Sequence, residues 1–241
     1  MAGCVQQVLA PGINRAAIDV LTLHGAEVLV PAGQGCCGAI AMHTGMTGQA
    51  RALARRNLAV LLRQDVDAVI VTAAGCGSAM KEYPLLFRGR PEEAAARRLA
   101  ERVRDIAEWL DATGVLPPGP LPATGRLAYH DACHLAHAQG IREAPRRLLA
   151  RIPGIELVEI PDGEICCGSA GTYNVEHPQL AGELGRRKAQ AILSTGADAV
   201  VTGNVGCIVQ IAAALREQGR PLPVHHTVEV LAQAYAPGAA G

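Results

Sequence analysis

The sequence predicts an α/β fold of two tandem duplicated Rossmann-like subdomains, with parallel sheets and a pseudo-twofold relation between the halves. One observation is that all eight cysteines form two sets of four, whose matching members are 129, 130, 130 and 131 residues apart. The sets are Cys4, Cys36, Cys37 and Cys76, and Cys133, Cys166, Cys167 and Cys207. Such a near-constant shift indicates an internal duplication. The other is that strand and helix patterns alternate in both halves, which favours parallel sheets with right-handed crossovers.

The first repeat is expected over residues 1–116 as one cysteine-rich domain. Leu53, Ala54, Leu58 and Leu61 recur at the spacing of one helix face. A later continuous apolar run is typical of a buried parallel strand. In order, the patterns predict a helix over Asn14–Leu23, a strand over Glu27–Val30, a cysteine loop over Pro31–Gly38, a helix over Thr47–Leu62, a strand over Asp67–Thr72 and a helix over Glu92–Leu110.

The second repeat is expected over residues 117–241 and restarts in the same order. The Pro- and Gly-rich stretch Asp111–Gly125 is the predicted linker, and Pro237–Gly241 is a predicted frayed tail. The patterns predict strands over Leu127–His130, Glu156–Ile160, Asp198–Thr202 and near Val224, and helices over Glu143–Ala150, Leu180–Leu193 and Val228–Tyr235.

One strand of the second repeat has no counterpart in the first. Leu127–His130 precedes Cys133, and an offset of 129 residues would place its equivalent ahead of Met1. The sequence is therefore expected to be a shortened form of a longer protein. The first sheet would then need another segment, or a partner, to complete it.

Composition excludes several classes of protein. Lys plus Arg and Asp plus Glu both number 22, so the basic excess typical of nucleic-acid binding is missing. No apolar stretch reaches the length of a membrane span, about 18 residues, and Met1–Ala10 lacks the pattern of a secretory signal. We expect a cytoplasmic protein, in a reducing compartment where clustered cysteines bind metals more often than they form disulfides.

The adjacent cysteine pairs also favour metal binding. Consecutive Cα atoms lie about 3.8 Å apart, whereas ordinary disulfides need about 4.4–6.8 Å. A bridge within Cys36–Cys37 or Cys166–Cys167 would be strained, while two neighbouring thiolates on one metal centre would not. We expect the cysteine loops to gather beyond the carboxyl ends of the strands, where helix N-termini favour an anionic centre.

Four cysteines in each repeat match the ligand count of a Cys4 zinc site or of a 4Fe–4S cluster. Neither a zinc knuckle nor a ferredoxin-type cysteine run occurs, so the spacing predicts two metal sites without identifying the metal. Buried structural cysteines do not explain the register, and reactive or redox-switching thiols are the other alternative. Glycines flank the cysteines and would let backbone amides approach sulfur: Gly38, Gly75, Gly77, Gly168 and Gly206.

The densest polar cluster is Tyr129–His137, which contains Cys133. His134 and His137 could share a helix face as metal ligands or proton carriers. The interpretation we favour is that Asp131 caps the helix, His134 bonds the loop or a sulfur atom, and His137 lies near the surface. No nucleophile–base pair, Walker loop or dinucleotide fingerprint is present, so we predict no catalytic residues.

These motifs resemble those of the CCG cysteine-rich domain, which occurs in heterodisulfide reductase, in the lactate-utilisation iron–sulfur protein and in the iron–sulfur subunit of glycolate oxidase. The residues around the cysteines are most similar to those of the iron–sulfur subunit of glycolate oxidase. The resemblance covers essentially the whole chain. The segments that carry it are Gly3–Gln7, Ala74–Gly77 with Lys81–Tyr83, His134–Gln139, Cys166–Tyr173 and Asn204–Cys207.

The resemblance implies an electron-transfer subunit whose eight cysteines hold one or two iron–sulfur clusters of the 4Fe–4S type, with zinc the lesser alternative. Implied partners are flavin-binding dehydrogenase subunits that oxidise glycolate, a ferredoxin-like segment or subunit, and an acceptor such as quinone. The complex would then be peripheral to the inner membrane. The competing implication is the iron–sulfur subunit of an L-lactate dehydrogenase complex.

Two departures from the family pattern bear on these expectations. The glycolate oxidase subunit carries an N-terminal ferredoxin-like segment that is absent here. The fullest family motif ends in Cys-x2-Cys, and Ala79 and Gln210 stand at those positions. A five-cysteine cluster is therefore disfavoured, as is a thiol–disulfide function. A zinc-stabilised docking scaffold without a redox role is the alternative from another class.

Overall fold

The computed structural model describes residues 1–121 and 125–236. Its larger sheet belongs to the second repeat and has the strand order β4-β3-β5-β6, with every neighbouring pair parallel. The strands are β3 (Gly125–His130), β4 (Ile155–Glu159), β5 (Ala199–Thr202) and β6 (Val224–His226). All four were predicted, which confirms the α/β class with a parallel sheet.

The sheet of the first repeat is smaller. In the described residues it consists of β1 (Val69–Val71) and β2 (Val103–Asp105), which pair in parallel with Val69 opposite Val103. The segment predicted as a strand over Glu27–Val30 is not one. That prediction was wrong because the segment has no neighbouring strand to pair with, and an isolated extended segment is not a β-strand.

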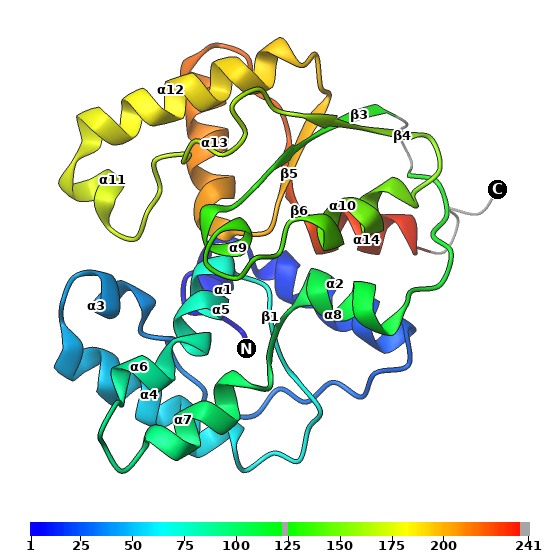
Figure 1. Cartoon of the computed structure of the whole chain (residues 1–241). Coiled ribbons are helices and arrows are strands. Elements are labelled where there is room, and N and C mark those ends of the chain that lie inside the picture. Colours follow the sequence, from blue (N-terminus) through cyan, green and yellow to red (C-terminus); the bar gives the residue numbers. More distant parts are fainter. Residues whose placement is uncertain (122–124, 237–241) are drawn as a thin grey trace.

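Helices connect the strands in both repeats (Figure 1). The first repeat contains α1 (Gln6–Leu9), α2 (Pro11–Leu23), α3 (Ala39–His43), α4 (Thr47–Leu61), α5 (Ala74–Lys81), α6 (Tyr83–Leu86), α7 (Glu93–Ala100) and α8 (Ile106–Thr113). The second contains α9 (Cys133–Ala136), α10 (Glu143–Ala150), α11 (Tyr173–Glu176), α12 (Pro178–Ser194), α13 (Val205–Glu217) and α14 (Thr227–Ala234).

The two faces of the larger sheet enter two different cores. Leu127 and Val201 pack into a cluster with α10 and α14, whereas Ala128 and Val200 pack into a cluster with α12 and α13. This alternation follows from the opposite directions of successive side chains in a strand. Because both faces are covered, the strand sequence Ala-Val-Val-Thr is buried throughout.

The repeats pack through equivalent helices. α2 of the first repeat lies against α14 of the second, and α8 of the first lies against α10 of the second. One cluster of buried residues runs from α2 and α8 through β3 and β5 to α10 and α14. The exchange of helices across the interface agrees with the predicted pseudo-twofold relation.

The prediction of one continuous helix over Glu92–Leu110 was wrong, because a strand interrupts it. α7 ends at Ala100, β2 follows, and α8 begins at Ile106. The pattern misled because Leu99, Val103 and Ile106 are buried from three elements at a spacing that one helix would also give. The signal for the break was Asp105 with Glu108, which form a capping box at the start of α8.

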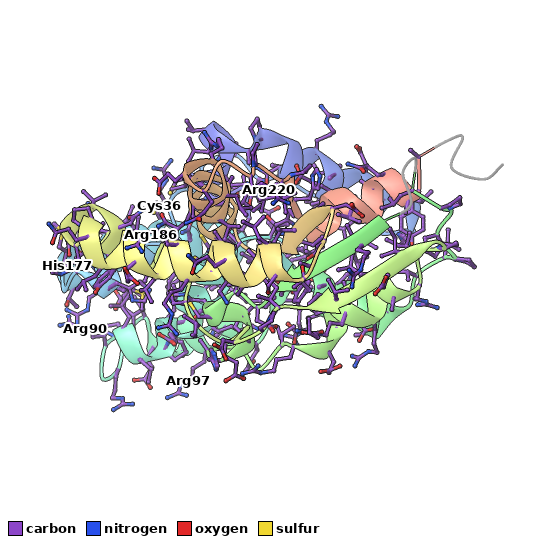
Figure 2. All side chains as sticks on the ribbon, turned by 90° about the horizontal axis from the view of Figure 1, so that it is seen from above. Cys36, Arg90, Arg97, His177, Arg186 and Arg220 are labelled. Carbon is purple, nitrogen blue, oxygen red and sulfur yellow. The ribbon has the colours of Figure 1, made fainter. Side chains whose placement is uncertain are left out.

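Other predictions differ from the structure in extent. α8 occupies the first residues of the predicted linker Asp111–Gly125, and residues 122–124 of that linker lie outside the described residues. The predicted frayed tail over residues 237–241 also lies outside them. Charged side chains such as Arg90 and Arg97 point outward at the edge of the molecule (Figure 2).

Candidate metal centres

The paired cysteines sit in loops that turn through a left-handed glycine. Gly38 has φ 84° and Gly168 has φ 94°, a region that side chains with a Cβ rarely adopt. A Cβ on Gly168 would lie 2.5 Å from the Ala181 carbonyl oxygen, and a Cβ on Gly38 would lie 3.4 Å from the Ala50 carbonyl oxygen. The second loop therefore approaches α12 more closely than a residue with a Cβ would allow, whereas at Gly38 the left-handed φ alone favours glycine.

Three other cysteines lie in the first turn of helices that follow strands. Cys76 is the third residue of α5 after β1, and Cys207 is the third residue of α13 after β5. Cys133 opens α9 after β3. The positive end of a helix favours the thiolate over the thiol, and the thiolate is the form that binds metals. This placement agrees with the predicted gathering at the carboxyl ends of the strands.

Contacts between thiols follow the sequence register and divide the eight cysteines into the two predicted quartets. In the first quartet the thiol of Cys4 contacts Cys36, Cys36 contacts Cys37, and the Sγ atoms of Cys37 and Cys76 are 3.1 Å apart. In the second, Cys133 contacts Cys166, Cys166 contacts Cys167, and Cys167 contacts Cys207. Both quartets line one pocket of about 270 Å³ between the repeats.

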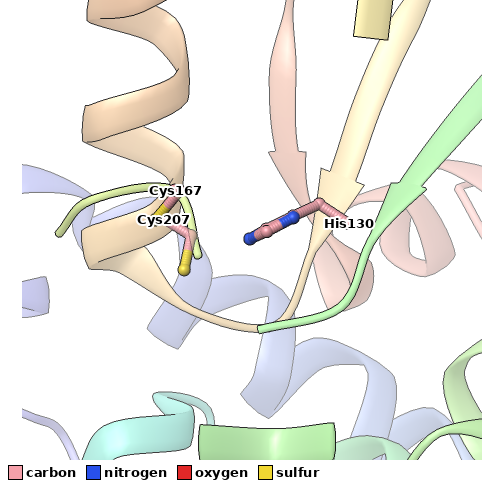
Figure 3. Close-up of side chains that lie close together, drawn as sticks. All are labelled: His130, Cys167 and Cys207. Atoms are coloured by element: carbon pink, nitrogen blue, oxygen red, sulfur yellow. The ribbon is translucent and has the colours of Figure 1, made fainter. Parts of the chain in front are cut away.

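The second quartet has additional nitrogen donors. His130, at the end of β3, lies beside Cys167 and Cys207, and the potential ligand atoms of these three are within 4.8 Å of one another (Figure 3). His130 is 1% exposed, and its Nδ1 has no hydrogen-bond partner. Asn204 donates from Nδ2 to Cys207 Sγ at 3.4 Å. The buried imidazole therefore faces the sulfur atoms with one nitrogen uncommitted.

The thiols of the second quartet differ in how readily they lose a proton. Contact with Cys133 lowers the pKa of Cys166, and contact with Cys167 lowers that of Cys207 well below its ordinary value, which His130 reinforces. The same contact with Cys166 raises the pKa of Cys133. In the first quartet, burial raises the pKa of Cys4. Contact with Cys166 and Cys207 also raises the pKa of Cys167, so within the second quartet Cys166 and Cys207 are the thiols that lose their protons first.

The cysteine loops are tied to the helix behind them by one buried polar side chain each. In the first repeat Asn57 on α4 donates to Cys36 O at 2.9 Å and accepts from Gly35 N at 3.0 Å. In the second, Lys188 on α12 donates from Nζ to Asp162 O at 3.2 Å and to Gly163 O at 3.0 Å. The side chains are 0% and 2% exposed, so one loop is anchored by a neutral amide and the other by a buried amine.

The histidine predictions were right in part. His134 Nδ1 lies 3.6 Å from Cys133 Sγ, and His137 is exposed, as expected. Across the pocket, the His134 ring lies 5.2 Å from that of His43, and burial lowers the pKa of His134.

Asp131, by contrast, does not cap the helix, because α9 has Ala132 at its N-cap position and no side-chain cap. The carboxylate pairs instead with Arg146, at 2.9 and 2.7 Å, and this guanidinium lies 4.7 Å from the centre of the Tyr129 ring. The Asp131 carboxylate therefore pairs with Arg146 and does not accept from the backbone N–H groups at the start of α9.

Sequence reasoning missed three residues near the centres, His130, Asn57 and Lys188. A signal was available for the last two. The contacts of Gly38 with Ala50 and of Gly168 with Ala181 set the offset between α4 and α12 at 131 residues. That offset makes Asn57 and Lys188 equivalent positions, each a polar residue in an otherwise apolar helix face. His130 has no such signal, because its equivalent position is Met1.

The donor spacing tests which group the quartets fit. Four thiolates on one zinc ion, at about 2.3 Å each, lie roughly 3.8 Å from one another. Among the described residues, the one group of three or more potential ligands that all lie within 4.8 Å is His130, Cys167 and Cys207. In neither quartet, therefore, do all four Sγ atoms lie as close to one another as the ligands of a single zinc ion do. Four cysteine thiolates in each quartet are a soft donor set of the kind that iron–sulfur clusters use.

Comparisons with known proteins agree with this donor set. The chain is 32% identical to "Lactate utilization protein A" of Oceanobacillus iheyensis over 95% of this chain and 93% of that protein. It is 35% identical to "Glycolate oxidase iron-sulfur subunit" of Escherichia coli over 97% of this chain and 57% of that protein. A "Probable glycolate oxidase iron-sulfur subunit" of Bacillus subtilis is 32% identical over 90% of this chain and 50% of that protein.

The chain thus spans nearly the full length of the first kind of relative and about half the length of the second. No helix in the described residues has the length and apolarity needed to cross a membrane. The family described as "Cysteine-rich domain" (CCG) matches residues 1–81 and 127–212, one match in each repeat. Each match contains four of the eight cysteines, and the chain belongs to the CCG cysteine-rich domain family, with lactate utilization protein A and the glycolate oxidase iron–sulfur subunit among its relatives.

Proposed function

We propose that this protein is an iron–sulfur electron-transfer subunit of a glycolate oxidase complex, which receives electrons from flavin-bearing partner subunits and passes them to an acceptor such as quinone. The observation that carries the proposal is the convergence of all eight thiols, as two contact-linked quartets, on one pocket between the repeats. The proposed domains are residues 1–116 and 117–241. The proposed ligands are Cys4, Cys36, Cys37 and Cys76 for one centre, and Cys133, Cys166, Cys167 and Cys207 for the other.

The chain's own residues would hold and shield these centres. A bound iron–sulfur cluster supplies one-electron transfer at a potential set by its surroundings. The left-handed glycines bring the paired thiols close to α4 and α12, and Asn57 and Lys188 fix the two loops. Buried Cys37, Cys167 and Cys207 exclude water, whereas exposed Cys4 leaves one edge of the first centre accessible.

The pocket supports electron exchange with a partner rather than chemistry on a metabolite. Its lining combines the eight thiols with apolar side chains such as Val5, Ile40 and Val209, which are 40%, 41% and 45% exposed. Exposed apolar residues around a redox centre suit the docking of another protein. We propose that the partners include a ferredoxin-like segment or subunit, and that they place this chain at the inner membrane.

A second candidate is the iron–sulfur subunit of an L-lactate dehydrogenase complex. It is favoured by the match over 93% of the length of a lactate utilization protein. The two candidates share the electron-transfer function and differ in the upstream oxidation. Flavoprotein subunits of each type, mixed anaerobically with this protein and either glycolate or L-lactate, would distinguish them by which pair bleaches the visible absorption of the cluster.

Anaerobic purification with iron, acid-labile sulfide and zinc analysis tests the shared proposal. We expect iron and sulfide in equal amounts, and an electron paramagnetic resonance signal on chemical reduction. Stoichiometric zinc without iron, and unfolding on chelation, would instead support a zinc-stabilised docking scaffold. Val209→Ala serves as a control variant, because this residue lines the pocket and carries no ligand atom.

A further inference from the structure

His130, at the end of β3, is a buried histidine whose hydrogen bonding is incomplete. Its side chain is 1% exposed, and Nδ1 has no hydrogen-bond partner among the described residues. His226, at the end of β6, is buried to the same degree, yet its Nδ1 accepts from Val228 N and its Nε2 donates to Thr72 O. A buried polar atom normally has a partner. The fold therefore supplies partners for His226 and leaves His130 able to bind something else.

The sheet directs His130 toward two of the cysteines. Ala128 of β3 packs in the cluster of buried residues that also contains Cys167 and Cys207. Side chains two residues apart in a strand lie on the same face, so His130 follows Ala128 toward these thiols. Its register partner on β5 is Thr202, whose buried Oγ1 is also unpartnered within the described chain. The apolar face of the sheet therefore ends in polar atoms next to the two cysteines.

The spacing of the three side chains suits a single metal ion. The potential ligand atoms of His130, Cys167 and Cys207 all lie within 4.8 Å of one another, and the imidazole ring points toward the sulfur atoms (Figure 3). A tetrahedral ion with sulfur at about 2.3 Å and nitrogen at about 2.0–2.1 Å sets its ligand atoms roughly 3.5–3.8 Å apart. Side-chain rotations that move each atom by about 1 Å or less therefore close the site.

Each of the three donors comes from a fixed part of the fold. His130 ends β3, and Cys207 lies in the first turn of α13, where Asn204 donates to its sulfur at 3.4 Å. The loop of Cys167 is anchored by Lys188, which donates to two backbone carbonyls of that loop. Ligands that are already positioned lose little conformational freedom when they bind. The three side chains are thus prepared for an ion that reaches them.

Burial and charge decide which ion fits. His130, Cys167 and Cys207 are 1%, 2% and 3% exposed. Two thiolates, a neutral imidazole and a divalent ion sum to zero charge, and a buried site tolerates a neutral complex best. Thiolate and imidazole donors favour Zn²⁺ or Fe²⁺ over Mg²⁺ or Ca²⁺. Both cysteines line the pocket between the repeats, so the fourth position of the ion faces this pocket.

We propose that the second repeat, when it holds no cluster, binds one divalent metal ion through His130, Cys167 and Cys207, with Zn²⁺ held more tightly than Fe²⁺. Among the described residues of the first quartet, no three potential ligands lie as close together. The ion uses two cysteines that the proposed second cluster also needs, so ion and cluster exclude each other. Zn²⁺ therefore blocks assembly of the second centre and spares the first. The ion site stands without the electron-transfer function, and the competition rests on it.

The first test is anaerobic titration of the cluster-free full chain with Co²⁺, in a Cys37→Ser background that disables the first quartet. We expect one ion, with the visible bands of tetrahedral thiolate-bound cobalt and a nitrogen neighbour in X-ray absorption. His130→Asn should lower the affinity by more than about tenfold, because loss of a group that merely orients a ligand already costs about 10–100-fold. His130→Cys, which restores a third soft donor, should recover the affinity but not the nitrogen neighbour.

His134→Asn is the matched control, because His134 lies 3.6 Å from Cys133 Sγ and outside the group of three. It should bind Co²⁺ as the Cys37→Ser parent does. Equal losses in His134→Asn and His130→Asn would overturn the proposal, as would unchanged affinity in His130→Asn. Circular dichroism of each variant shows that the fold is kept, and the recovery in His130→Cys decides the matter if His130→Asn unfolds.

The second test is cluster reconstitution with iron and sulfide in the otherwise unaltered chain, after one equivalent of Zn²⁺ has been added. We expect the resonance signal of the second centre to be lost and that of the first to remain, and His130→Asn should make the second centre resistant to Zn²⁺. Equal loss of both centres would overturn the selectivity. If no cluster forms with or without Zn²⁺, the electron-transfer proposal fails, whereas the cobalt titration still decides whether the ion site exists.

Discussion

The two repeats share a backbone plan and differ in what surrounds their cysteines. Cys4 is exposed where its equivalent Cys133 is half-buried, and the neutral Asn57 stands where the second repeat has Lys188. His130, which has an uncommitted nitrogen beside the second quartet, is replaced by Met1. The duplication thus kept the positions of the thiols while the charges around them diverged, so the two proposed centres would differ in potential.

The largest expected effect tests whether the quartets are independent. Cys37→Ser and Cys167→Ser each remove a buried thiol from one contact chain, so each variant should lose one centre and about half of the iron while the other centre remains. Iron analysis and the resonance signal of each reduced variant check this, with Val209→Ala as the control. Loss of all iron from either single variant would mean that the quartets bind one shared group.

A second comparison concerns the left-handed glycines. Gly168→Ala should cost about 3 kcal/mol or more in the free energy of unfolding, because the new Cβ would meet the Ala181 carbonyl at 2.5 Å in addition to the strained φ. Gly38→Ala should cost about 1–2 kcal/mol, since its nearest contact is 3.4 Å. Anaerobic denaturant unfolding measures both. Equal costs would show that the backbone conformation matters and the close approach does not.

The third comparison uses two buried N-cap residues at equivalent helices, Asp105 of α8 and His226 of α14. Burial raises the pKa of Asp105 to about 7 and lowers that of His226 to about 4. His226 Nδ1 accepts from Val228 N at 3.1 Å, so Nε2 carries the proton and donates to Thr72 O at 2.7 Å. Burial therefore favours the neutral form of both side chains, and their contributions to stability change with pH in opposite directions.

The contribution of Asp105 is complete below its ordinary pKa of 3.8 and is lost as the pH rises through about 7. That of His226 is complete above 6.5 and is lost as the pH falls through about 4. Relative to wild type, Asp105→Asn should gain up to about 4 kcal/mol between pH 4 and 8, and His226→Asn should lose up to about 3 over the same range. Unfolding at several pH values measures these slopes. The surface substitution Asp19→Asn is the control, and parallel profiles for all variants would contradict the assignment.

The smallest expected effect concerns Lys188. An ammonium beside the second quartet stabilises the reduced, more negative centre, so Lys188→Gln should lower its midpoint potential by tens of millivolts. Lys188→Arg keeps the charge and should leave the potential near that of wild type. Redox titration followed by resonance spectroscopy reads the two centres separately. An equal shift of both centres would indicate a general change in the fold rather than a local charge effect.

Sequence patterns predicted the second repeat better than the first, for a physical reason. β3, β4 and β5 each have a neighbour on at least one side, so their apolar runs became strands where expected. The similar run at Glu27–Val30 did not, because β-structure depends on a partner that lies elsewhere in the chain. β2 was missed because its buried Val103 stands at a helical spacing from Leu99 and Ile106 in the neighbouring helices.

The grouping of the candidate ligands was predictable because the near-constant offset between matching cysteines divides them into two sets of four. Asn57, Lys188 and His130 were missed, because the offset that makes Asn57 and Lys188 equivalent does not show that either side chain reaches a cysteine loop, and His130 has no equivalent of its own kind. Their relation to the cysteines depends on how α4, α12 and β3 lie in space. Asp131 was assigned as a helix cap for the same reason, since Arg146 is fifteen residues away in sequence.

Equivalent helices exchange places across the boundary between the repeats: α2 rests on α14, and α8 rests on α10. Each repeat therefore buries part of the apolar surface of the other repeat. Separation of the repeats would expose the apolar surface of both at once. The chain should therefore unfold in a single cooperative transition. Two clipped fragments that meet again in solution should restore each other.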